Sequence, residues 1–365
     1  MPLPRFAPSA SLFHLLHSPA LRPLQTFVRT VEERRHPAAP EPFLPGRSPA
    51  VEQCGAPGPA AEVRRERGRG RVPTIVLGGF VPDSGEQVFL LRRFLLARGD
   101  LYPIVYPKDG FSLDLICAQL DDLVGDLRAR GERPVILAVS FGAGLALEWL
   151  RRCRERGADA GVAGVVLVSP VACVADLIPP GPGKPATLVG RVLRPFLDSP
   201  GDAPEAVVER ARQVFARMFE AGAQNREALG RLMTPSELGR LHTAVMSTIR
   251  GLTGRGARER VGVLASLRSP LDYFSPVVLP LTSAPALVLF AEREDAMLDA
   301  GSPTAFAFRR ALSAYFPAGA TAEVRARPGS PPVQHASLIF HVGEFLPPLH
   351  AFYGRLPARG LPLAA

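Results

Sequence analysis

The stretch that most constrains the fold runs from residue 134 to residue 150. It opens with the apolar run Val135 to Val139, which is too short for a helix and has the length of a buried strand. Apolar residues at the spacing of a buried helix face close the stretch: Leu145, Ala146, Leu147, Trp149 and Leu150. Ser140 stands between the two patterns, followed by Gly142 and Gly144. We therefore expect a tight strand-to-helix turn with a serine at its tip.

Such a turn has chemical consequences for the serine. It lifts the hydroxyl of Ser140 above the edge of the sheet, and the small residues after it let backbone segments pass closely. The N–H of Phe141 then lies at a helix N-terminus, where it can hold a developing oxyanion. The pattern predicts a nucleophile elbow. The alternative is that Ser-Phe-Gly only caps a helix after a buried strand.

Residues 138 to 142, Ala-Val-Ser-Phe-Gly, resemble the G-x-S-x-G pattern of the α/β-hydrolase superfamily, with alanine in the position of the first glycine. The resemblance implies an α/β fold in which helices flank a mostly parallel sheet. It also implies a serine, an acid and a histidine in that order along the chain.

Apolar runs typical of buried strands alternate with helical patterns along two parts of the chain. These parts, residues 72–175 and 281–360, are the predicted hydrolase core. Residues 176–280 show no obvious strand, and the amphipathic segment from Glu205 to Ala221 presents Phe215 and Phe219 on one side. We expect this insertion to form a helical cap.

Residues 1–71 differ in composition from the rest of the chain. They contain 12 prolines and end in an arginine-rich run, so we expect a flexible tail, with order beginning at Val72. An apolar cluster between Leu12 and Phe27 has three alternative interpretations: a loosely structured arm, a segment that packs over the core, or a segment that contacts a lipid surface.

The resemblance also assigns a second oxyanion donor. In the family, the loop after the first core strand usually reads His-Gly, and the next residue contributes its N–H. Here the loop reads Gly78-Gly79-Phe80, so Phe80 is the expected donor.

Three histidines follow the last predicted strand: His335, His341 and His350. His335 lies in the loop before the terminal helix, where its ring can turn toward Ser140, so it is the expected base. The other two fall inside the predicted helix and are interpreted as surface or packing residues.

The acid remains open between two neighbours. Glu294 and Asp295 both follow the strand that begins at Ala286, and only one of them can point inward. A Gly-x-x-acid turn favours Glu294, whereas the spacing to the next apolar residues favours Asp295, which we prefer. Asp176 and Asp299 are weaker alternatives.

The formal charge of +9 does not indicate a nucleic-acid partner. Residues 1–71 carry 11 arginines against 6 glutamates, which accounts for +5 of the total, and arginines and aromatic residues do not form a recognition motif.

No cofactor, metal motif, signal peptide or transmembrane segment is expected. Of four cysteines, Cys117 and Cys153 fall on predicted helices as buried thiols, which favours a reducing compartment, the cytoplasm. The oligomeric state stays open.

These features favour a serine hydrolase that cleaves a small-molecule carboxylic ester or thioester through an acyl-enzyme, with an esterase-like or lipase-like preference for apolar acyl groups. The expected catalytic residues are Ser140, His335 and Asp295. Two alternatives remain: acyl transfer to an acceptor other than water, and a non-catalytic binding protein on the same fold.

Overall fold

A computed structural model describes residues 41–42, 49–198, 203–223 and 233–356. Its centre is a sheet with the strand order β1-β2-β4-β3-β5-β6-β7-β8. The strands from β3 to β8 run parallel, and β1 and β2 are antiparallel to their neighbours. The predicted mostly parallel α/β sheet is therefore confirmed. The strand bounds are β1 (Glu41–Pro42), β2 (Glu62–Arg65), β3 (Thr74–Leu77), β4 (Leu101–Val105), β5 (Val135–Val139), β6 (Gly164–Val168), β7 (Ala286–Ala291) and β8 (Gly319–Val324).

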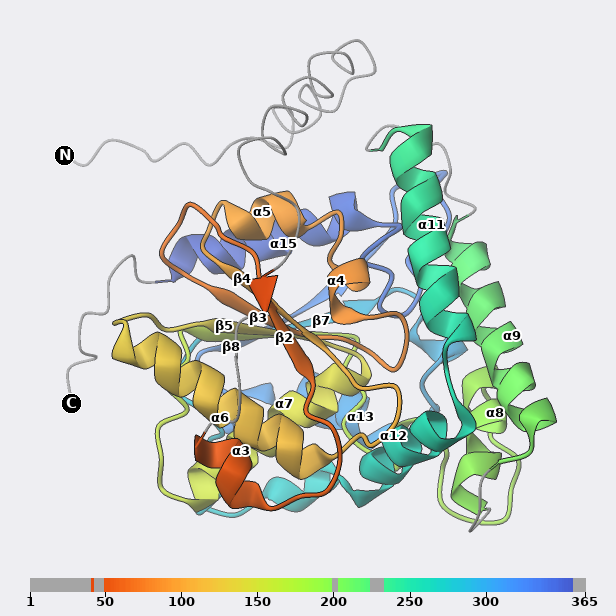
Figure 1. The fold of residues 1–365 in the computed structure, drawn as a ribbon, viewed down its shortest axis with the longest axis horizontal. Coiled ribbons are helices and arrows are strands. Elements are labelled where there is room, and N and C mark those ends of the chain that lie inside the picture. Colours follow the sequence, from red (N-terminus) through yellow and green to blue (C-terminus); the bar gives the residue numbers. More distant parts are fainter. Residues whose placement is uncertain (1–40, 43–48, 199–202, 224–232, 357–365) are drawn as a thin grey trace.

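Helices cover both faces of the sheet, which explains why its central strands are apolar throughout. Within β5, Ile136 and Ala138 join one core cluster, and Leu137 and Val139 join the other. Figure 1 shows α5 (Arg92–Leu96) and α15 (Val342–Arg355) above the sheet, with α3 (Pro49–Cys54), α6 (Leu113–Ala129) and α7 (Phe141–Glu155) below it. The sheet is thus the middle layer of three.

The ordered core begins earlier than Val72, so the prediction of a flexible tail up to residue 71 was wrong for residues 49–71. Strand β2 pairs with β4 and buries Val63. The Gln119 side chain holds the segment before β2, because it accepts from the Ala61 N–H at 2.9 Å and donates to the Ala61 carbonyl oxygen at 2.6 Å. The cluster from Leu12 to Phe27 lies outside the described residues.

Two segments of the core each form a pair of short helices. The segment after residue 84 forms α4 (Ser84–Gln87) and α5, and the segment after Ser302 forms α13 (Pro303–Arg310) and α14 (Leu312–Tyr315). Asp83 is the N-cap residue of α4, and the hydroxyl of Ser84, the first residue of the helix, donates to the Ile104 carbonyl oxygen at 2.8 Å. Short 3-10 helices complete the core and its edges: η2 (Val174–Asp176), η3 (Pro270–Tyr273) and η4 (Glu294–Ala296).

The connection from β6 to β7 contains four α-helices and no strand among its described residues. These are α8 (Leu188–Asp198), α9 (Glu205–Ala223), α11 (Pro235–Arg250) and α12 (Gly254–Ser266), called the cap helices below. Helix α8 packs against α9 and α12, and α9 packs against α11. Figure 1 shows the group at one end of the sheet.

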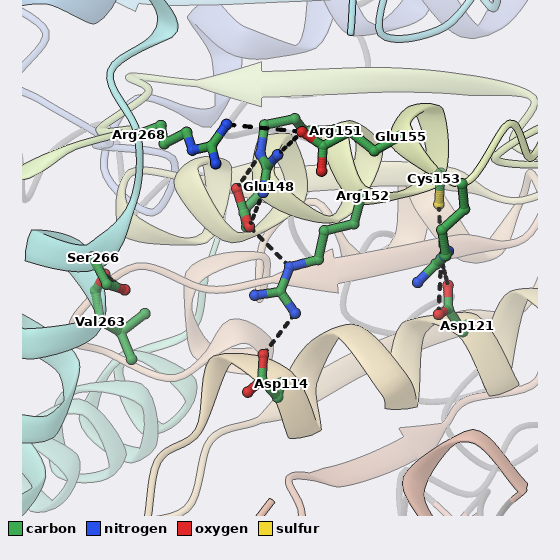
Figure 2. A network of polar contacts seen from close by, with 11 residues as sticks. Asp114, Asp121, Glu148, Arg151, Arg152, Cys153, Glu155, Val263, Ser266 and Arg268 are labelled. Atoms are coloured by element: carbon green, nitrogen blue, oxygen red, sulfur yellow. Dashed lines mark hydrogen bonds and ion pairs between the residues drawn. The ribbon is translucent and has the colours of Figure 1, made fainter. Parts of the chain in front are cut away.

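A polar network anchors the helix that follows Ser140. The buried Glu148 carboxylate accepts hydrogen bonds from Arg151 and Arg152 on α7, and Arg152 reaches Asp114 on α6 at 2.6 Å (Figure 2). Figure 2 also shows Arg268, beyond α12, directed at Glu155. These ion pairs link α7 to α6 and to the end of the cap helices.

Candidate active site

The turn between β5 and α7 holds Ser140 in a conformation that side chains rarely adopt, with φ of 50° and ψ of −116°. The end of β6 and the residues after it fix its backbone: the Ser140 N–H donates to the Val168 carbonyl oxygen, and the Ser140 carbonyl oxygen accepts from the Val171 N–H. A Cβ at Gly142 would lie 2.4 Å from the Gly78 carbonyl oxygen, so glycine is required there for the helix to approach the loop after β3. The predicted strand–serine–helix turn is confirmed.

His335 links two segments that are distant in sequence. It follows β8, its Nε2 lies 2.9 Å from the Ser140 hydroxyl oxygen, and its Nδ1 lies 2.5 Å from Oε2 of Glu294. The three side chains thus form a continuous hydrogen-bonded series. This is the arrangement of a nucleophile, a base and an acid that orients the base.

The preferred acid, Asp295, is not part of this series, and the expectation that it points inward was wrong. Its side chain is 69% exposed and pairs with Arg293, whereas the side chain of Glu294 is 8% exposed. Helix η4 begins at Glu294 and directs adjacent side chains to opposite sides. The Gly-x-x-acid spacing, with Ala291 in the glycine position, was the signal to follow. The Ala291 N–H donates to Oε1 of Glu294 at 2.7 Å.

The surroundings of Glu294 favour its charged form. Burial opposes ionisation, but the pKa of the carboxyl group is still lowered below its ordinary value of 4.5. The charge of His335 and hydrogen bonds from His335, Ser169 and the Ala291 N–H cause the decrease in this pKa. A carboxylate held in this way keeps the proton of the imidazole on Nδ1 and leaves Nε2 free to face Ser140.

Ser169 is a contributor that sequence reasoning missed. It follows β6, is fully buried and has a φ of 46°. Its hydroxyl oxygen accepts from the Ala336 N–H at 2.9 Å, and its side chain also hydrogen bonds to Glu294. Ser169 therefore connects the loop of His335 to the acid. A serine after a buried strand gives no local signal of such a role.

The loop after β3 lies beside the nucleophile. A Cβ placed on Gly79 would be 3.4 Å from Cβ of Ser140, and the rings of Phe80 and Phe141 are 5.9 Å apart. Phe141 is the first residue of α7, where backbone N–H groups lack a partner within the helix. Among the described residues the Phe80 N–H also has no hydrogen-bond acceptor. Both groups are available for an oxyanion.

The remaining candidate acids and histidines have structural contacts. The buried carboxylate of Asp176 accepts hydrogen bonds from the Ser302 and Thr304 hydroxyls and from the backbone N–H groups of Ala172, Cys173 and Thr304, so it holds the start of α13. Asp299 donates its N–H to the Asp176 carbonyl oxygen. His341 precedes α15 and contacts Ser337 and Pro331, and the ring of His350 packs on Phe94.

Cap helix α9 reaches two sides of this site. The Phe215 ring stacks on Phe80 with 5.7 Å between centroids, and the Phe219 ring lies 5.2 Å from Phe340, beyond the His335 loop. Aromatic side chains from one helix thus contact the segments that follow both Gly79 and His335. The expectation that Phe215 and Phe219 share a side of the helix is consistent with these contacts.

Within the described part of the chain, no group of three histidine, cysteine, aspartate or glutamate side chains has an arrangement suited to a metal ion. None of its helices has both the length and the apolar character needed to cross a bilayer. Cys117 and Cys153 are free and buried on α6 and α7, as expected.

No family model matches the sequence, and no curated protein matches it either. Solved structures do match the fold. An esterase from Exiguobacterium antarcticum aligns with a TM-score of 0.53 at 13% identity, over 80% of this chain and 96% of that one. MenH from S. aureus aligns with a TM-score of 0.52 at 15% identity, over 80% of this chain and 97% of that one. A thermophilic esterase from Thermogutta terrifontis aligns with a TM-score of 0.51 at 16% identity, over 81% of this chain and 94% of that one. At these identities the similarity establishes the architecture.

Proposed function

We propose that this chain, which has the α/β-hydrolase fold, is a serine hydrolase acting on a small-molecule carboxylic ester or thioester. The observation that carries the proposal is the series from Ser140 through His335 to Glu294, with contacts of 2.9 and 2.5 Å. The esterases among the structures of similar fold support the same reaction class.

The contacts are suited to acyl transfer in two steps. As the Ser140 oxygen attacks the carbonyl carbon, Nε2 of His335 takes its proton, and the N–H groups of Phe80 and Phe141 stabilise the oxyanion. The tetrahedral intermediate expels the alcohol or thiol, which receives the proton from His335. Water then attacks the acyl-enzyme with His335 again as base, and the acid is released as Ser140 regains its proton.

In this proposal Glu294 acts through His335. Its carboxylate holds Nδ1–H, so the tautomer with a free Nε2 is the stable one before the reaction. The same carboxylate stabilises the imidazolium that forms during attack. Asp295 has no part in the reaction.

The cap supports a preference for apolar acyl groups. Phe215 of the cap stacks on Phe80, a residue of the loop that would hold the oxyanion. Burial of an acyl chain against such a surface contributes about 0.8 kcal/mol per methylene. We therefore expect acyl chains of at least medium length to be preferred over acetyl.

The test is a series of p-nitrophenyl esters and matching thioesters, from acetyl to decanoyl, followed by stopped-flow absorbance. An acyl-enzyme predicts a burst of p-nitrophenol close to the enzyme concentration whenever deacylation is slower than acylation. Added alcohols and thiols distinguish hydrolysis from transfer, because transfer yields a new ester or thioester instead of the free acid. Absence of turnover across the whole series would contradict the proposal and favour a binding role.

A further inference from the structure

A buried arginine of the cap contacts the loop beside the nucleophile. Arg260, on α12, is 6% exposed. Its guanidinium donates to the Phe80 carbonyl oxygen at 2.6 Å and to the Pro107 carbonyl oxygen at 3.2 Å. One side chain of the cap therefore joins the segments that follow β3 and β4.

The environment of this cation is largely aromatic. Its guanidinium carbon lies 5.8 to 5.9 Å from the ring centroids of Phe80, Tyr106 and Phe111. Its Nε has no hydrogen-bond partner among the described residues. Burial lowers the pKa of Arg260, and the carboxylate of Asp83 acts in the opposite direction. Burial of a guanidinium carries a desolvation free energy that its hydrogen bonds must offset. The burial of Arg260 therefore indicates that its hydrogen bonds to the two loops stabilise their arrangement.

The Arg260 contact falls at a specific point of the loop. The Gly79 N–H donates to the Gln87 side chain at 2.9 Å, which anchors the loop on one side of the Gly79–Phe80 peptide. The Phe80 carbonyl, held by Arg260, anchors it on the other side. The Phe80 N–H lies between these two fixed groups, so its direction depends on both.

A second cap helix holds the same region. The Thr248 hydroxyl on α11 donates to Oε1 of Glu86 at 2.8 Å, and Oε2 of Glu86 accepts from the Asp83 N–H at 3.1 Å. Together with Phe215 on α9, three cap helices contact residues 78–86, called the oxyanion loop below.

We propose that Arg260 is a positioning residue that orients the Phe80 N–H through the Phe80 carbonyl, so that the cap completes the oxyanion site as well as contacting substrate. The consequence for catalysis rests on the proposed function; the contact with the loop does not. Loss of the contact releases one end of the loop and weakens oxyanion stabilisation more than substrate binding.

The test compares variants of two arginines of the cap. Arg260→Gln removes the charge and the paired donors, and Arg260→Lys keeps the charge without the planar fork that spans two carbonyls. Arg212→Gln is the matched control, because Arg212 on α9 donates to the Leu252 carbonyl oxygen, within the cap, at 2.9 and 2.7 Å. Melting temperatures of all three variants measure any general loss of stability.

Two readouts separate positioning from a structural role. For ester hydrolysis, both Arg260 variants are expected to lower kcat by about 10²-fold, the order seen for loss of one oxyanion donor, with a smaller change in KM. In hydrogen exchange followed by mass spectrometry, peptides covering residues 78–86 are expected to exchange faster in both. Arg212→Gln is expected to leave both quantities close to wild type.

Wild-type kcat and wild-type exchange in the Arg260 variants would overturn the inference. Full activity of Arg260→Lys together with loss of activity in Arg260→Gln would also overturn it. That result would show that a positive charge is sufficient and that the paired hydrogen bonds to the two carbonyls are not needed. If the wild-type protein hydrolyses no ester, the proposed function fails, while exchange of the oxyanion loop still decides whether Arg260 holds it.

Discussion

Nδ1 of His335 lies 2.5 Å from the Glu294 carboxylate, while the carboxylate of the adjacent Asp295 pairs with Arg293 at the surface. Two neighbouring acids therefore have separate roles. The buried one has a lowered pKa and faces the candidate base, and the exposed one belongs to the solvated surface.

Glu294→Gln is expected to reduce kcat for ester hydrolysis on the order of 10⁴-fold, because the amide no longer holds the reactive tautomer of His335 or its charged form. Asp295→Asn is the matched control and is expected to stay within a few-fold of wild type. Steady-state kinetics on one p-nitrophenyl ester checks the ranking, and the opposite ranking would remove Glu294 from the site.

The difference between these neighbours explains what the sequence could predict here. The turn at Ser140 is visible because a buried strand, small residues and a helix follow one another locally. The choice of acid depends on the direction of a single turn at η4, where two spacings in the sequence favoured different residues and only the Gly-x-x-acid spacing agreed with the structure. Ser169 and Arg260 act through contacts with residues 167 and 180 positions away, which leave no local pattern.

The sequence did not indicate strand β2, for a different reason. It lies between the two-residue edge strand β1 and β4, and charged residues occupy three of its four positions, so it lacks the apolar run that marks the central strands. The charged, proline-rich composition of the N-terminal region therefore gave no indication that part of it forms a strand of the sheet.

Removing residues 1–66 is expected to destabilise the fold, because it deletes α3 and β2 and exposes β4. Loss of the buried Val63 alone accounts for about 2 kcal/mol. A control truncation of residues 1–40 keeps both elements. Chemical denaturation gives the free energy of unfolding of both truncated proteins. Equal values would show that β2 contributes nothing to the stability of the fold.

Phe215→Ala is expected to shift the preferred acyl chain length, because Phe215 stacks on Phe80 of the oxyanion loop. Met218→Ala, on the more exposed side of the same helix, is the control and is expected to leave the preference unchanged. The kcat/KM series over acyl chain length gives the answer. Acetyl esters as best substrates, with a preference that neither variant moves, would refute an acyl-binding role for the cap.

Glu86 predicts a dependence of stability on pH. Burial raises its pKa from 4.5 to about 7, opposed by the hydrogen bond from Thr248. Because the folded protein binds this proton more tightly than the unfolded chain, its contribution is complete below about pH 4.5 and is lost as the pH rises through about 7.

Glu86→Gln is expected to remove this component, since glutamine keeps the shape of the α4 cap and does not titrate. The measurement is the free energy of unfolding between pH 4.5 and pH 8, in the variant and in the wild type. Identical slopes in the two proteins would mean that Glu86 titrates normally.

The most direct test of the central claim is covalent labelling by a fluorophosphonate, with the modified residue located by mass spectrometry. The wild-type protein is expected to carry one adduct, on Ser140, whose hydroxyl lies 2.9 Å from Nε2 of His335. Ser140→Ala, checked for folding by circular dichroism, is expected to lose the adduct entirely. Full labelling of that variant, or an adduct on another residue of the wild type, would contradict the assignment of Ser140 as the nucleophile.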